Sequence, residues 1–228
     1  MDHDGDGQGD ARSGLTRRTV LAGAGGLAGA GAMAPAVQAQ AVRRLGVPGS
    51  GRAAAEVVGR LVQDGLAVTG HGFLTRLSGV TDSAMFRGSD RTAAGARFTF
   101  TAATEVRDRF ISGALFSATL LGTISFFFDE QGGDFENPAT FADGRRIASF
   151  DARIQNVLTV IGPDQALTTL RAELTQRTAP RFSLDGRRTR YGRRGLRSGL
   201  WATGPGTRTD VAAPRAVFEV GGRVDVPG

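Results

Sequence analysis

The stretch Ala96–Asp129, ARFTFTAATEVRDRFISGALFSATLLGTISFFFD, decides the fold of this chain. Between Arg97 and Arg107, apolar or small side chains alternate with polar ones at a period of two, which is typical of a strand with one buried face. The buried face is predicted to hold Phe98, Phe100, Ala102, Thr104 and Val106. Phe and Thr also suit the pleated surface of a sheet. We therefore predict that this stretch forms the central strands of an antiparallel sheet.

Beyond the charged pair Asp108–Arg109, the same stretch becomes apolar on both faces. The residues Phe110–Leu121 admit a helix, but Ser, Thr and Gly are frequent among them and no capping residue is evident. We favour two strands that are broken near Gly122, the second of them over 124–128.

The rest of the chain repeats these strand signals between turn residues. Alternation is clearest over 147–160 and 166–177, and the turn Gly162–Asp164 joins these two strands into a predicted hairpin. Shorter strands are predicted over 66–77, 182–184, 187–191, 196–203 and 216–226. The segments 78–95 and 129–146 are rich in turn residues and are predicted to be loops.

Many short strands with few helices predict an all-β fold, formed by a single antiparallel β-barrel with a β-sandwich as the alternative. The barrel is favoured because no predicted strand carries visible protection of an open edge. We place the barrel domain at 66–228 and a linker or lead-in at 42–65. Within the lead-in, 53–63 is either a short helix or irregular chain, because Gly59 weakens a helix by roughly 1 kcal/mol relative to Ala.

Residues 1–41 have the architecture of a cleaved export signal. Arg17 and Arg18 precede a weakly apolar run, and small residues allow cleavage after Ala39 or Ala41. The segment resembles a twin-arginine signal peptide, which implies export of a folded, secreted protein across a bacterial inner membrane. The partners that this resemblance implies are the twin-arginine export machinery and signal peptidase.

Two other interpretations of the signal segment are disfavoured. Its apolar run is short and interrupted by glycines, so that it does not predict a stable membrane span. The sequence GAGGLA at 23–28 matches a dinucleotide loop, but no strand precedes it and no βαβ unit surrounds it.

The mature region resembles, at the level of pattern, the barrels of allene oxide cyclases and dirigent proteins. The likeness rests on the order of the predicted strands and on GTISFFF at 122–128 followed by the loop glycines Gly132 and Gly133. It implies a barrel and, as one alternative activity, an isomerase or cyclase that encloses its substrate. No functional motif matches residue by residue, so the resemblance implies no site residue. The chain is also similar to twin-arginine-exported actinobacterial proteins with no assigned activity.

Composition limits the chemistry available to the 228 residues. All 28 basic residues are arginine, and the absence of Cys excludes disulfides, thiolate nucleophiles and cysteine metal sites. Removal of 1–41 takes away three arginines and four aspartates, which raises the net charge from +6 to +7. The acidic loop 129–136 lacks the spacing of a calcium loop, and a zinc site lacks ligands. We therefore predict neither a metal site nor a cofactor.

Three residues are candidates to line a binding cavity. His71 is the only histidine after the signal segment, and it can serve as a general base if it points into a barrel lumen. Tyr191 and Trp201 are each the single residue of their kind, although a core or rim position is the commoner one. Because no second His, no Cys and no GxSxG elbow accompany His71, we predict no catalytic residue and leave open whether the protein is an enzyme.

The strongest local charge feature is Arg187–Arg197, RRTRYGRRGLR. Its basic residues are Arg187, Arg188, Arg190, Arg193, Arg194 and Arg197. Guanidinium groups suit phosphate geometry, so the segment is a candidate for binding an anionic envelope polymer, with a solvated hairpin as the alternative. The sequence thus predicts an exported binding or structural barrel, with a small apolar ligand in its lumen; a cyclase-like enzyme and an envelope polyanion binder are the alternatives.

Overall fold

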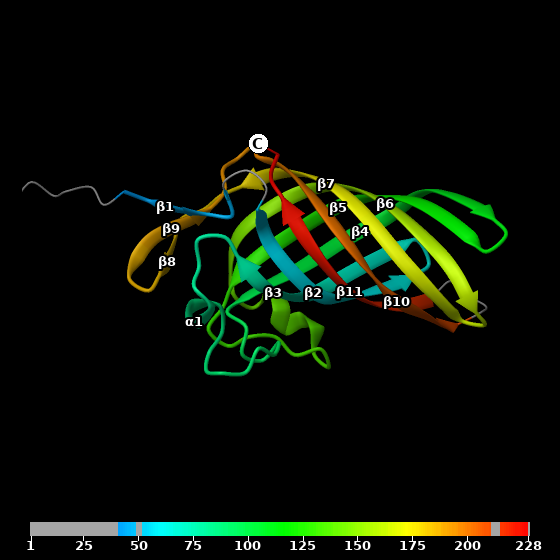
Figure 1. Cartoon of the computed structure of the whole chain (residues 1–228), viewed down its shortest axis with the longest axis horizontal. Coiled ribbons are helices and arrows are strands. Elements are labelled where there is room, and N and C mark those ends of the chain that lie inside the picture. The colour runs from blue at the N-terminus through cyan, green and yellow to red at the C-terminus, as the bar shows by residue number, and fades with distance from the viewer. Residues whose placement is uncertain (1–40, 49–51, 211–214, 228) are drawn as a thin grey trace, which may run out of the picture. The chain divides into compact units, whose positions relative to one another are not determined.

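The computed structural model describes residues 41–48, 52–210 and 215–227. Within this part, eight strands close into an antiparallel barrel in the order β10-β11-β2-β3-β4-β5-β6-β7 (Figure 1). Their bounds are Ala53–Asp64 (β2), Ala67–Leu77 (β3), Phe98–Ser112 (β4), Leu115–Phe128 (β5), Arg145–Gly162 (β6), Gln165–Thr178 (β7), Arg197–Asp210 (β10) and Arg215–Asp225 (β11). The predicted all-β barrel is confirmed, and the closed ring of strands excludes the sandwich. The predicted signal lies outside the described residues, apart from Ala41.

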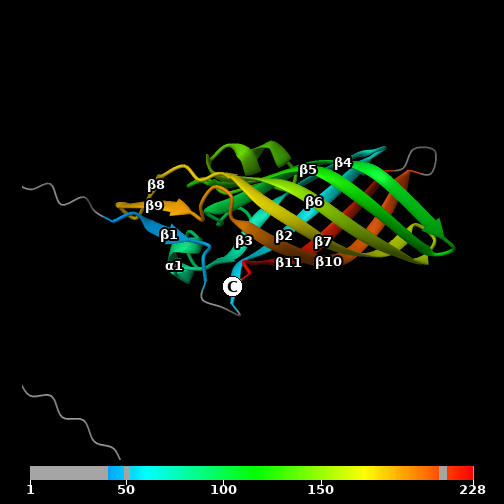
Figure 2. The ribbon, with the colours of Figure 1, turned by 90° about the horizontal axis from the view of Figure 1, so that it is seen from above.

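A small second sheet lies at one end of the barrel. It has the order β1-β9-β8, in which β1 (Arg43–Leu45) runs parallel to β9 (Arg187–Tyr191), and β9 pairs with β8 (Phe182–Leu184). The helix α1 (Asp82–Met85) and the 3-10 helix η1 (Pro138–Ala142) lie at the same end (Figure 2). We call this the plugged end. The other end, formed by the turns between β2 and β3, β4 and β5, and β6 and β7, is called the hairpin end. None of the helices in the described part of the chain has the length and hydropathy of a membrane span.

The central stretch forms β4 and β5, which pair from Phe98↔Phe128 to Ser112↔Leu115. The predicted break near Gly122 is wrong, because β5 runs through it and the turn falls at Gly113, whose φ of 58° suits glycine. At Gly122 a side chain would collide with the backbone oxygen of Ala103 on β4, so this glycine permits close strand approach instead. The pair Asp108–Arg109 lies inside β4, beside a bulge.

The barrel begins before residue 66, in the segment that we predicted to be a lead-in. Residues 53–64 form β2, which pairs with β11 on one side and β3 on the other and so closes the ring. Gly59, which argued against a helix, faces the ring of Phe100: a Cβ at Gly59 would lie 2.6 Å from the Cζ of Phe100. Strand pairing on both sides therefore decided a segment whose local pattern was ambiguous.

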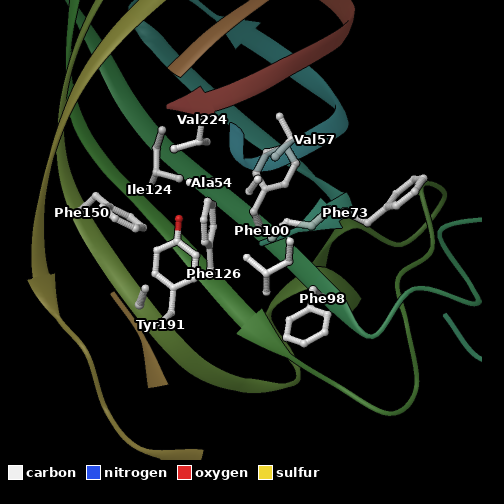
Figure 3. Packing of buried hydrophobic residues seen from close by; sticks show 14 of the residues in the cluster. Ala54, Val57, Phe73, Phe98, Phe100, Ile124, Phe126, Phe150, Tyr191 and Val224 are labelled. Carbon is white, nitrogen blue, oxygen red and sulfur yellow. The ribbon is translucent and has the colours of Figure 1, made fainter. Parts of the chain in front are cut away.

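Aromatic rings fill the plugged end. Phe126 lies 5.1 Å from Phe150 and 5.3 Å from Tyr191 between ring centroids, and Phe150 lies 5.9 Å from Tyr191. Figure 3 shows the Tyr191 ring between those of Phe126 and Phe150. Tyr191 belongs to β9, which is outside the barrel sheet, and is 1% exposed. The Tyr191 side chain thus closes this end of the barrel, and its burial raises the pKa of its hydroxyl.

Candidate ligand-binding lumen

A cavity of about 460 Å³ occupies the barrel between the aromatic plug and the hairpin end. All eight barrel strands contribute to its lining. Toward the plugged end the lining includes Val57, Phe126, Leu174 and Val224. Most of the lining is aliphatic or aromatic, so the lumen offers mainly apolar surface to whatever enters it.

The barrel is hollow in this half because small residues stand where inward-pointing side chains would otherwise meet. These residues are Gly70, Ala102, Ala118, Ala166, Ala202, Gly206 and Ala216. A barrel of eight strands is just wide enough for large side chains to fill, as the aromatic rings do at the plugged end. Alanine and glycine at inward positions of several strands leave room for a ligand in the other half of the barrel.

Few polar groups reach the interior of the lumen. The Thr104 hydroxyl donates to the Val68 carbonyl oxygen at 2.9 Å, and the Thr168 hydroxyl donates to Asn156 Oδ1 at 2.6 Å. The amide nitrogen of Asn156 has no hydrogen-bond partner within the described ranges, and Asn156 lines the cavity. The lumen therefore presents a polar donor group to a ligand at Asn156.

Charged residues are confined to the mouth, at the hairpin end. Arg208 Nε lies 3.3 Å from Asp164 Oδ1, and the Arg208 backbone N–H also donates to the Asp164 carbonyl oxygen at 2.8 Å. Arg215 Nε lies 3.0 Å from Asp64 Oδ1, and this hydrogen bond raises the pKa of Arg215. The guanidinium group of Arg109, which also lines the cavity, has no such partner in the part of the chain that the structure describes.

His71 does not line the lumen, so the condition for its predicted role as a general base is not met. Its side chain lies on the outer face of β3, where its ring is 5.3 Å from that of Phe141 and 5.7 Å from that of Phe135. The histidine is 5% exposed and its Nε2 is buried without a hydrogen-bond partner. Burial lowers the pKa of His71, the charge of Arg60 lowers it further, and Glu219 partly offsets both.

The other two candidate cavity residues also lie elsewhere. Tyr191 is part of the aromatic plug, and Trp201 is 52% exposed on the outer face of β10, opposite Arg171 and Arg223 in register. The three candidates therefore do not meet. Each is the only residue of its kind after the signal segment, whereas the lining is made of common residues. The signal that marks it is alanine and glycine at inward positions, such as Ala102, in strands that otherwise carry large apolar residues.

The arginine segment lies at the plugged end, away from the mouth. Arg187, Arg188, Arg193, Arg194 and Arg197 are exposed, and Arg190 is partly buried with its Nε unpartnered. Gln176 holds the turn that follows β9. Its Nε2 donates to the backbone carbonyl oxygen of Tyr191 at 3.0 Å, and its Oε1 accepts from the backbone N–H of Arg193 at 3.1 Å. Across the described residues, no carboxylate lies within ion-pair distance of any of the six arginines.

No cluster of His, Asp or Glu side chains that could hold a metal ion occurs among the described residues. No known family model matches the sequence, and comparisons with curated proteins and with solved structures also give no match. The case for a function therefore rests on the barrel and its lumen.

Proposed function

We propose that the chain is an exported binding protein whose barrel lumen holds one small apolar ligand. The cavity of about 460 Å³ carries the proposal, because it falls within the usual range of roughly 300–1,000 Å³ for small-molecule sites. Burial of apolar ligand surface against this lining is favourable in free energy, and the Asn156 amide can orient a ligand by hydrogen bonding. This combination of apolar walls and sparse polar groups is typical of such sites.

Binding without catalysis is favoured by the positions of the ionisable groups. In the described lining these are Arg109, Asp164, Arg208, Asp210 and Arg215, all of them at the mouth. Arg97 and Glu105, charged residues of the central stretch, form ion pairs and do not line the lumen. An isomerase resembling allene oxide cyclases is the alternative, and it would have to act on the substrate through enclosure and Asn156.

A titration with the apolar fluorophore Nile red tests the lumen. Ala102 lines the cavity, whereas its neighbour Ala103 faces outward from the same strand. We expect Ala102→Phe to fill the lumen and weaken dye binding at least tenfold, on the order of 1.4 kcal/mol or more. Ala103→Phe is the matched control and should bind like the unchanged protein. Equal affinity of the two variants, both folded by circular dichroism, would place the dye outside the lumen and refute the proposal.

Export is proposed from the leader over 1–41. The test is mass spectrometry of the protein recovered from the culture medium, with an expected N-terminus at residue 40 or 42, after cleavage at Ala39 or Ala41. Replacement of Arg17 and Arg18 by Lys should retain the protein inside the cell. Release of the variant at the normal rate would exclude the twin-arginine route.

A second candidate function is the binding of an anionic envelope polymer by the segment Arg187–Arg197. The observation that favours it is that no described carboxylate pairs with its six arginines, which leaves their charge available to an external polyanion. Long-chain polyphosphate should bind with an affinity that falls as salt is added, and Arg193→Ala plus Arg194→Ala should weaken it. The matched control is Arg107→Ala plus Arg177→Ala, because these arginines already pair with Glu105 and Asp151. Equal weakening by both double variants would show non-specific attraction only.

A further inference from the structure

The hairpin end carries an unusual amount of exposed apolar surface. Among the described residues, ten large apolar side chains are exposed, and six of them lie at this end. We call these six the apolar lip: Leu66, Phe110, Ile111, Leu115, Ile161 and Leu167. Phe110 is 65% exposed, more than any other large apolar residue described. Hairpin tips in water are normally polar, so a concentration of apolar residues there indicates an interaction surface.

The lip lies along part of the rim of the cavity mouth. Leu66 lies in the turn between β2 and β3, and Ile161 stands next to the turn between β6 and β7. Thr159 of β6 pairs with Leu115 on one side and Leu167 on the other, which brings these two leucines to the same outer rim. The lip therefore extends over three of the hairpins, from β2 to β7.

The hairpin of β4 and β5 projects furthest. Pairing of β3 with β4 stops at Ala67↔Glu105, but β4 continues to Ser112 (Figure 1). The projecting tip carries Phe110, Ile111 and Leu115, half of the lip. A projecting apolar tip can enter an apolar phase while the rest of the barrel stays in water.

Apolar residues of the lip and of the lumen adjoin one another along the strands. Phe116, Val160 and Ala166 line the cavity, and each is the chain neighbour of a lip residue, namely Leu115, Ile161 and Leu167. An apolar ligand that leaves a phase in contact with the lip would therefore meet apolar lining just inside the mouth, past charged residues such as Arg109 and Arg208. A purely structural surface would not need this arrangement.

We propose that the apolar lip docks the mouth of the barrel on the surface of a lipid bilayer, from which the lumen takes up or to which it delivers its ligand. The positive net charge, +6 for the full chain and +7 without residues 1–41, favours approach to an anionic membrane. At the mouth, Arg109 precedes Phe110 and its guanidinium group has no carboxylate partner within the described chain, so it is available to a lipid phosphate. The inference rests on the proposed function, because docking matters only if the lumen holds an apolar ligand.

Vesicle flotation of the full chain tests the docking. The probes are vesicles of phosphatidylcholine alone and of phosphatidylcholine mixed with phosphatidylglycerol. Phe110→Ser plus Ile111→Ser should lower the partition into both kinds of vesicle at least about tenfold, because two apolar side chains no longer enter the interface. Val58→Ser plus Leu121→Ser is the matched control, since both residues are exposed on the outer face of the barrel, away from the mouth. All variants keep residues 1–41, so any affinity of that segment for lipid is common to them.

The charge contribution has its own variant. Arg109→Gln should reduce the preference for vesicles that contain phosphatidylglycerol by about fivefold and leave binding to phosphatidylcholine unchanged. If the lip variant floats as well as its control, bilayer docking by this surface is excluded. If sedimentation velocity shows a dimer that the lip variant dissociates, and no protein floats, the lip joins two copies of the chain and the membrane proposal is overturned.

Failure of the docking and failure of the proposed function give different results. The lip variant should still bind Nile red in solution, because its lumen is intact. Ala102→Phe should lose the dye but float with vesicles as the unchanged protein does. Flotation of the unchanged protein without dye binding would support docking through the lip and refute ligand binding in the lumen. Dye binding without flotation would support ligand binding and refute docking.

Discussion

The ring of Tyr191 lies directly against Gly46, where a Cβ would collide with the ring carbon Cε2. Gly46 also has a φ of 67°, which favours glycine. We expect Gly46→Ala to destabilise the protein by about 2–4 kcal/mol, from backbone strain and displacement of the plug. Gly65→Ala is the matched control, because its φ is 63° but nothing lies within 4 Å of the added Cβ. Urea unfolding of both variants measures the difference; equal losses would show that the Tyr191 contact contributes nothing.

The buried amide of Gln176 should matter for the stability of the plugged end. Besides its bonds to Tyr191 and Arg193, its Nε2 donates to the Thr178 carbonyl oxygen at 2.9 Å. Gln176→Leu leaves these backbone groups unpaired, and we expect a loss of about 2–4 kcal/mol in the free energy of unfolding. Gln155→Leu, on an exposed position of β6, should change it by less than about 0.5 kcal/mol. A small effect of Gln176→Leu would mean that water replaces the amide.

His71 should make stability depend on pH. Its pKa in the fold lies below the ordinary value of 6.5, so the unfolded chain binds the proton first as the pH falls. Stability is unaffected well above pH 6.5 and decreases as the pH falls below it, by at most about 1.4 kcal/mol per pH unit for one proton. The groups that face the imidazole are Arg60, Glu219 and the rings of Phe135 and Phe141.

The measurement for His71 is urea unfolding between pH 7.5 and pH 5.5. His71→Phe should remove the decrease below pH 6.5, because phenylalanine cannot be protonated. Parallel stability curves for the unchanged protein and the variant would assign the pH dependence to other groups.

Asn156 should determine which apolar ligands bind well. Its amide nitrogen, which has no partner among the described residues, can donate to a carbonyl, so 2-decanone should displace Nile red more effectively than decane does. Asn156→Leu should lower the affinity for 2-decanone about three- to tenfold, which corresponds to the loss of one hydrogen bond. The affinity for decane should stay nearly unchanged. Equal weakening of both ligands would show that the substitution merely alters the shape of the lumen.

The sequence predicts the strands better than the site. Alternation placed Phe98, Phe100 and Ala102 on one face correctly, because period-two burial is a local property that one strand displays by itself. It failed at residues 53–64, where pairing with two neighbours decides the structure. It also put the turn at Gly122 and not at Gly113, because glycine serves both turns and close strand contacts.

The lumen was predicted in kind but not in its residues. A cavity results from side chains that are absent, and small residues on several strands reveal it only once the register of the barrel is known. His71 and Trp201 stand out in the sequence because each type is rare, but the rarity of a residue does not predict that its side chain faces the lumen. The strand predicted over 187–191 in the arginine segment is confirmed, since Arg187–Tyr191 is β9.

The ring of Tyr191 closes the plugged end of the barrel, so the lumen is a pocket and not a channel through the barrel. Within the described part of the chain the lumen opens at the hairpin end, so a molecule would enter and leave through the same mouth. If the lumen holds a ligand as proposed, what the mouth contacts would govern ligand exchange, and net transfer would require the protein itself to move between a donor and an acceptor.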